Sequence, residues 1–309
     1  MTFRIFIEPQ QGASYDRVLR LAQRAERLGY DGFFSSDHYL KMGGAAGLPG
    51  PLDTWTTMAG LARDTTRLRL GSLVTPVTFR QPGPLAIAIA QIDDMSGGRV
   101  ELGIGSGWFE NEHRAHGLAF PPIGVRHQML EEQLAIITGL WSTPIGETFS
   151  FDGTHYRVDA SPALPKPLQQ PRVPIIIGGK GPKRTPRLVA TYADEFNVSF
   201  PSLDVFTHHR GLVRGACAAR GRDPDSLVYS AALIVCCGAD EAEFLQRARA
   251  IDRDPDELRQ VGLAGLPAEV VDRIGAYRAA GVERFYLQTL DIDDLDHIKL
   301  IATEVLPQL

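Results

Sequence analysis

Cysteine is scarce in this sequence, and its placement offers little for cross-linking or metal binding. The 309 residues include three cysteines, Cys217 and the adjacent pair Cys236 and Cys237, and no Cys-x-x-Cys motif. This argues against a disulfide framework and against a thiolate metal centre. We therefore expect the chain to work in a reducing, cytoplasmic setting.

Excess positive charge and long apolar runs are also missing. Lys and Arg total 32 against 37 Asp and Glu, a net charge of −5, which argues against a nucleic-acid partner because phosphates need a basic surface. Charges interrupt residues 1–8, unlike a signal peptide. The longest apolar stretch, around residues 85–92, is too short to cross a membrane. We expect neither a nucleic-acid nor a membrane partner.

What the sequence does contain is a regular alternation of apolar runs and amphipathic segments. The first amphipathic segment has Ser14 as its expected N-cap and Gly29 as its stop. Strands are predicted at residues 3–7, 31–35, 68–74, 100–104, 175–177, 195–199, 228–235 and 283–287. Helices are predicted at residues 14–29, 55–62, 84–95, 130–141, 185–192, 239–251, 267–280 and 295–305, and a further helix is predicted around His208 and His209.

One stretch, residues 143–174, breaks this alternation. It contains an expected hairpin around Asp152-Gly153, followed by a proline-rich return. Eight strands alternating with helices predict a single (β/α)8 TIM barrel domain over residues 1–309, with this stretch as an insertion between helix four and strand five. A doubly wound sheet is the alternative that periodicity alone leaves open.

In such a barrel, catalytic groups lie where strands end. Asp37 and His38 follow the second strand, and a His beside an Asp can exchange protons near neutral pH. A surface histidine bonded to the backbone is the structural alternative. At the end of the third strand, the glycine, hydroxyls and proline of Gly71 to Pro76 suit close backbone approach to a flat ligand, although any loop can have this composition.

Two glycine-rich segments follow later strands. Gly105-Ser106-Gly107 lacks the spacing of a dinucleotide fingerprint but allows a ring or phosphate to reach the backbone. Acidic residues and histidines follow it without any recognised metal-ligand spacing, so we expect no metal. Residues 178–184 carry Lys180, Lys183 and Arg184 before an expected helix capped by Thr185, with Pro186 at its first position. Cations beside a helix start favour a phosphate site, with a flexible basic loop as the alternative.

Taken together, the motifs resemble the luciferase-like monooxygenase superfamily. They occur in the expected order along most of the chain, and they look most like the branch that uses coenzyme F-420, a deazaflavin with a phosphate and glutamate tail. The matching segments are Glu26-x-x-Gly29-Tyr30-Asp31-Gly32-x-x-x-x-Asp37-His38, Thr75-Pro76-Val77-Thr78-Phe79-Arg80, Gly105-Ser106-Gly107-Trp108, and residues 177–197 from Ile177-Gly178-Gly179 to Phe196-Asn197.

The resemblance implies a site. A non-proline cis peptide bond is expected at Ser72–Leu73, behind the ring. Sugar-phosphate dehydrogenase relatives carry a catalytic Glu where this chain has Trp108, which points instead to an apolar or aromatic substrate. The ring would lie among His38, Ser72, Leu73, Thr75, Gly105 and Ser106, and the phosphate among Gly178, Gly179, Lys180, Gly181, Lys183 and Arg184.

The expected activity is hydride transfer between coenzyme F-420 and a small organic substrate. His38, steadied by Asp37, would exchange the proton, while Trp108 and Asn197 would contact the substrate. Glu110 and Glu112 are interpreted as structural. The rivals are a monooxygenase using reduced FMN from a partner reductase, a hydrolase or lyase on the same barrel, and a non-catalytic flavin-binding protein. Relatives are often dimers, which makes a homodimer an expectation.

Overall fold

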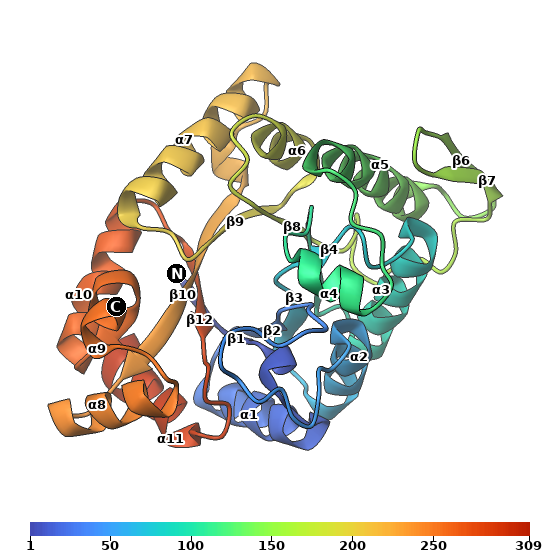
Figure 1. Ribbon diagram of the computed structural model, residues 1–309. Coiled ribbons are helices and arrows are strands. Elements are labelled where there is room, and N and C mark those ends of the chain that lie inside the picture. The colour runs from blue at the N-terminus through green and yellow to red at the C-terminus, as the bar shows by residue number, and fades with distance from the viewer.

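Eight parallel strands close into a ring in the computed structural model, which describes residues 1–309 (Figure 1). Each strand pairs with its two neighbours, and the last pairs with the first. The TIM barrel is confirmed and the doubly wound sheet is excluded. In order around the ring, the strands are β1 (Thr2–Ile7), β2 (Gly32–Ser35), β3 (Arg69–Ser72), β5 (Val100–Gly105), β8 (Ile175–Gly178), β9 (Glu195–Ser199), β10 (Val228–Cys237) and β12 (Arg284–Gln288).

The helices surround this ring (Figure 1). Ser14 is the N-cap of the first one, and Gly29 ends it at φ 90°, a left-handed conformation that favours glycine. No helix is long and apolar enough to span a membrane. The main helices are α1 (Tyr15–Leu28), α2 (Thr54–Asp64), α3 (Pro82–Ser96), α5 (Ile123–Ser142), α6 (Arg184–Tyr192), α7 (Leu203–Ala219), α8 (Glu241–Ala250), α10 (Pro267–Ala279) and α11 (Leu295–Leu300).

Four short elements were not predicted, because each is too short to show a period. They are β4 (Thr75–Pro76), α4 (Glu110–Ala115), α9 (Pro255–Val261) and β11 (Leu263–Gly265). The predicted cap at Thr185 is wrong. Helix α6 begins at Arg184, so Thr185 lies inside the first turn, and Lys183 occupies the N-cap position without a side-chain hydrogen bond.

The predicted hairpin is present outside the ring (Figure 1). Strands β6 (Phe149–Asp152) and β7 (Arg157–Ser161) pair antiparallel. The carboxylate of Glu132 on α5 accepts hydrogen bonds from three successive backbone N–H groups of the turn, at residues 154–156. The hairpin is thereby fastened to the outer face of the barrel.

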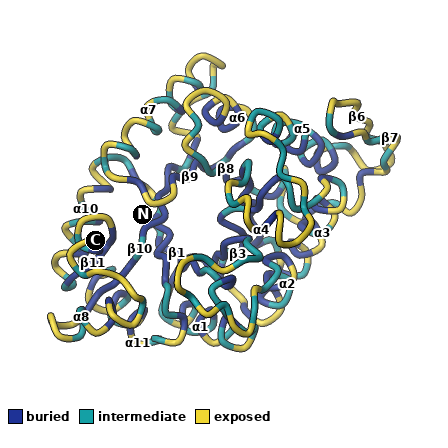
Figure 2. Tube along the Cα trace, viewed as in Figure 1, coloured by how far each residue is buried: buried dark blue, intermediate teal, exposed yellow.

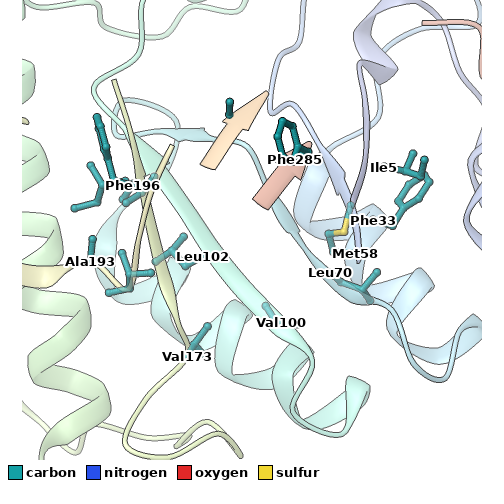
Figure 3. Packing of buried hydrophobic residues seen from close by; sticks show 14 of the residues in the cluster. Ile5, Phe33, Met58, Leu70, Val100, Leu102, Val173, Ala193, Phe196 and Phe285 are labelled. Carbon is teal, nitrogen blue, oxygen red and sulfur yellow. The ribbon is translucent and has the colours of Figure 1, made fainter. Parts of the chain in front are cut away.

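The main hydrophobic core lies between the ring and its helices. Buried residues concentrate along the strands and the inner helix faces, whereas exposed ones follow the loops and outer faces (Figure 2). Ile5, Phe33, Leu70, Leu102 and Phe285 belong to this core of 61 buried residues (Figure 3). They alternate along their strands with residues that face into the ring.

The inside of the ring is filled differently at its two ends. Near the strand starts, Arg4 is 1% exposed and donates to both oxygens of Glu101 at 2.6 and 2.9 Å. Arg69 donates to the same carboxylate at 2.6 Å, and Arg284 pairs with Glu195. Burial acts to raise the pKa of Glu101, but Arg4 and Arg69 outweigh it and bring that pKa to about 2.

Removing this carboxylate should destabilise the barrel. Glu101→Gln removes a carboxylate that both Arg4 and Arg69 bind and leaves the buried Arg4 with Asp31 as its one carboxylate partner. The free energy of unfolding should therefore fall by about 3–5 kcal/mol. Urea titration at pH 7 measures the change. As a control, Asp293→Asn removes the exposed partner of Arg17 and should cost less than about 1 kcal/mol. A Glu101→Gln protein as stable as this control would contradict the structural role of the pair.

Candidate functional site

A cavity of about 650 Å³ opens at the end of the ring where the strands finish. Its lining comes from the segments that follow most of the strands, which is where barrel enzymes place their active sites. The lining residues are Phe6, Glu8, Ser36, His38, Met42, Leu73, Val74, Pro76, Gly105, Ser106, Gly107, Trp108, Ile123, Arg126, His127, Gly178, Gly179, Lys180, Gly181, Thr185, Ser199 and Phe200.

Glycines shape one wall of this cavity. A Cβ on Gly103 would lie 1.9 Å from the carbonyl oxygen of Ser72, and one on Gly105 would lie 2.9 Å from a methyl group of Val74. The same Val74 side chain would be 3.3 Å from a Cβ on Gly178. The three glycines therefore leave room for Val74 to pack between strands at this wall.

The non-proline cis peptide bond behind this wall is at Leu73–Val74, so the prediction of Ser72–Leu73 is wrong by one residue. Regular pairing with β2 continues to Ser72, and the N–H of Leu73 still donates to the carbonyl of Ser35 at 2.9 Å. The strand is therefore interrupted only after Leu73. Leu73 and Val74 both line the cavity.

Ser72 and Thr75 do not line the cavity but hold this bend from behind. The Thr75 hydroxyl accepts a hydrogen bond from Trp55 Nε1 at 2.9 Å and donates to the Ser72 hydroxyl at 3.1 Å. Ser72 in turn donates to the carbonyl of Gly103 at 2.7 Å. These two predicted cofactor residues thus contact the wall and not the cavity.

His38 lies at the cavity wall, with its side chain 13% exposed. Its Nδ1 is 2.9 and 3.1 Å from the two carboxylate oxygens of Glu112, which is fully buried. Its Nε2 has no protein partner and is not a buried atom. The rings of Trp108 and Phe109 lie edge-on to the imidazole, with centroids at 5.7 and 6.2 Å. Only Nε2 is therefore free to meet a ligand.

Asp37 does not contact His38, so the predicted support from this neighbour is wrong. Its buried carboxylate pairs with Arg80 at 2.5 Å, and Arg80 also binds Asp53. Burial raises the pKa of Asp37 even though Arg80 opposes the rise. Successive residues leave a strand end in opposite directions, which turns Asp37 away from the cavity that His38 enters. The sequence interpretation named Glu112 only as a structural residue and did not predict its contact with His38, 74 positions away.

The segment that carries Glu112 is itself firmly held. His113 is buried, with Nδ1 2.8 Å from the carbonyl of Phe109 and Nε2 2.6 Å from the hydroxyl of Thr78. Arg126 donates to the carbonyl of Ser106 at 3.1 Å, which fixes the glycine loop before α4. These contacts fix α4 independently of any ligand.

The basic loop after β8 is only partly directed into the cavity. Lys180 lines it along with Gly178, Gly179 and Gly181, and burial lowers the pKa of Lys180. Lys183 and Arg184 are exposed and outside the lining; Arg184 donates to the carbonyl of Gly124 at 2.6 Å.

On the facing helix α5, Arg126 and His127 line the cavity, and the sequence interpretation missed both. Burial, then Arg184 and Arg126, lower the pKa of His127, whose Nδ1 is buried without a partner. Their position in the first turns of α5, the first long helix after the glycine loop, was the available signal.

The mouth of the cavity is apolar. Trp108 is 65% exposed, Ile123 52% and Phe200 45%. Asn197, predicted to contact substrate, is outside the lining and donates to the hydroxyl of Ser230 at 2.9 Å. No group of three or more His, Cys, Asp or Glu side chains is arranged to hold a metal ion.

Comparison with known proteins gives this cavity a family context. A sequence model of luciferase-like monooxygenase matches residues 1–254. The chain is 32% identical to an F420-dependent glucose-6-phosphate dehydrogenase of Nakamurella multipartita, over 94% of this chain and 91% of that one. It is 31% identical to an FMNH(2)-dependent dimethylsulfone monooxygenase of Pseudomonas putida, over 90% and 84%.

The fold points the same way. The structure of an F420-dependent secondary alcohol dehydrogenase in complex with an F420-acetone adduct superimposes with a TM-score of 0.85, covering 98% of both chains at 20% identity. The family match spans most of the sequence, and the barrel agrees with it. The chain therefore belongs to the luciferase-like monooxygenase family.

Proposed function

We propose that this protein is an oxidoreductase that transfers a hydride between coenzyme F-420 and a small organic substrate with apolar or aromatic character. One observation carries the proposal: a single cavity combines a flat glycine wall, a cationic loop and an imidazole with a free nitrogen. A deazaflavin cofactor requires a surface for its ring, cations for its phosphate, and a proton-exchanging group beside the reacting carbon. The buried, free thiols support a reducing setting, so we propose that the enzyme acts in the cytoplasm.

The residues present fit this cofactor. Side chains at Gly105 or Gly178 would enter the space against Val74, which a planar ring needs. Leu73, Val74, Gly105 and Ser106 would hold the ring, and Gly178 to Gly181 with Lys180 would hold the phosphate. Lys183 and Arg184 lie at the outer edge of that loop and would attract the anionic tail electrostatically.

When bound, the deazaflavin supplies a carbon, C5, that gives or accepts a hydride. The protein excludes water, orients the substrate and moves the proton that must balance the hydride. His38 Nε2 faces the cavity and is the atom positioned to take or return that proton. Trp108 at the mouth would pack over an apolar or aromatic part of the substrate.

A second candidate function is supported by one relative. The Pseudomonas putida protein is named as FMNH(2)-dependent, so a monooxygenase using reduced FMN from a partner reductase would suit the same wall. The two functions differ in cofactor affinity, because F-420 carries the longer anionic tail. Titrating the protein with F-420 and with FMN separates them, and tighter binding of FMN would favour the monooxygenase.

Removing the cation inside the cavity should weaken cofactor binding. Lys180→Ala loses a charge-assisted contact to the phosphate, which corresponds to about a tenfold or greater loss of F-420 affinity. The double substitution Lys183→Ala with Arg184→Ala should have a smaller effect and mainly reduce the salt dependence, because both residues lie outside the cavity lining, to which Lys180 belongs. Calorimetric titration at two salt concentrations measures both effects.

Lys299→Ala, on α11, is the matched control, because this lysine is exposed and outside the cavity lining. It should leave the affinity unchanged. If Lys180→Ala bound F-420 as tightly as this control, the phosphate site would be wrongly assigned.

Replacing His38 should affect the chemistry more than binding. His38→Asn keeps a polar side chain but removes the titrating group, so hydride transfer should slow by about 100-fold or more. Single-turnover absorbance of bound F-420, with a substrate found by screening small alcohols and carbonyl compounds, gives the rate. Weak F-420 binding combined with a normal rate at saturation would instead make His38 a binding residue.

A further inference from the structure

His38, the proposed proton-exchanging residue, is hydrogen-bonded to the carboxylate of Glu112. We propose that Glu112 is a positioning residue that holds His38 in its Nδ1–H tautomer and thereby presents Nε2 to the cavity as a proton acceptor. This inference deepens the proposed function, because it assigns the state in which His38 meets the substrate. It concerns the protein alone, so it can be tested without cofactor or substrate.

The hydrogen bonds that the carboxylate of Glu112 accepts determine which imidazole nitrogen holds the proton. Glu112 is 0% exposed and accepts the backbone N–H of Tyr39 through Oε2 at 3.0 Å. His38 Nδ1 lies 2.9 Å from Oε1 and 3.1 Å from Oε2. An ionised carboxylate only accepts hydrogen bonds, so Nδ1 must carry the proton. In a neutral imidazole, the other nitrogen is then an acceptor.

Glu112 is the one residue to which the His38 side chain is hydrogen-bonded. Asp37, its neighbour in sequence, is fully engaged with Arg80. Trp108 and Phe109 contact the imidazole only through their ring edges. The position of Glu112 is set by α4, in which the side chain of His113 is hydrogen-bonded to Phe109 and Thr78. The carboxylate of Glu112 is therefore held in place, and the orientation of the His38 imidazole is set by its hydrogen bond to that carboxylate.

The same geometry predicts that Glu112→Gln reverses the tautomer of His38. In Glu112→Gln the amide oxygen is the only acceptor left, and the N–H of Tyr39 requires it because an unpaired buried donor is costly. The amide nitrogen of the new side chain then faces His38 Nδ1 and donates to it. Nδ1 becomes the acceptor, the proton moves to Nε2, and the atom facing the cavity changes from an acceptor to a donor.

The test is nitrogen-15 NMR of the histidine rings in the cofactor-free protein, at a pH where the imidazole is neutral. The His38 signals are identified by their loss in His38→Asn. We expect an Nδ1–H ring in the unsubstituted protein and an Nε2–H ring in Glu112→Gln. Glu110→Gln, an identical change at an exposed site on the same helix, should leave the Nδ1–H ring unchanged.

An Nε2–H ring in the unsubstituted protein would overturn the inference, and this result does not depend on whether any variant folds. An unchanged tautomer in a folded Glu112→Gln protein would overturn it as well. A failure of F-420 to bind the unsubstituted protein would instead remove the proposed function and leave the tautomer result standing.

With F-420 and a substrate in hand, kinetics provide a second measurement. Glu112→Gln should slow hydride transfer by about 10- to 100-fold, the scale for removing a partner that orients a reacting ligand. Affinity for F-420 should stay within about twofold, and the limb of the pH–rate profile that depends on His38 should shift. A loss of cofactor affinity equal to the loss of rate, with an unshifted profile, would show a purely structural role and overturn the inference.

Discussion

The arrangement of this molecule depends on how the inside of the barrel is filled. At the strand starts, Arg4 and Glu101 form a buried ion pair, and Arg69, Arg284 and Glu195 complete a charged network. These large charged side chains pack inside the ring at that end, where Arg4 and Glu101 are buried. At the strand ends, the inward positions include Gly105 and Gly178. Because one end is filled and the other is lined by small residues, a cavity forms at one end only.

The wall of the cavity follows from the same constraint. Gly103 must lack a side chain because the carbonyl of Ser72 occupies the space a Cβ would need. The chain can then bend at Leu73–Val74, and the hydroxyls of Ser72 and Thr75 hold the bend from behind. The residues that form the flat wall are thus positioned by interior packing, before any ligand is bound. Such preorganisation lowers the ordering cost when a planar ring binds.

The sequence predicted those features that depend on local periodicity. The ring strands and the hairpin were placed nearly correctly, because apolar alternation and turn residues act over a few positions. Elements as short as α4 and β4 were missed, since they show no period. The contact between His38 and Glu112 also escaped prediction, because it joins the loop after β2 to helix α4, 74 positions away. Asp37 was the adjacent candidate, and only the structure shows Arg80 bound to it.

One short segment brings the two sides of the proposed site together. Residues 105–112 contribute the glycine wall through Gly105, the apolar mouth through Trp108 and the partner of His38 through Glu112. Trp108 precedes α4 and is exposed, whereas Glu112 is on the helix and fully buried. A change of side chain at Trp108 can therefore alter the mouth without disturbing the carboxylate. The segment thus separates the apolar mouth of the cavity from the carboxylate that contacts His38.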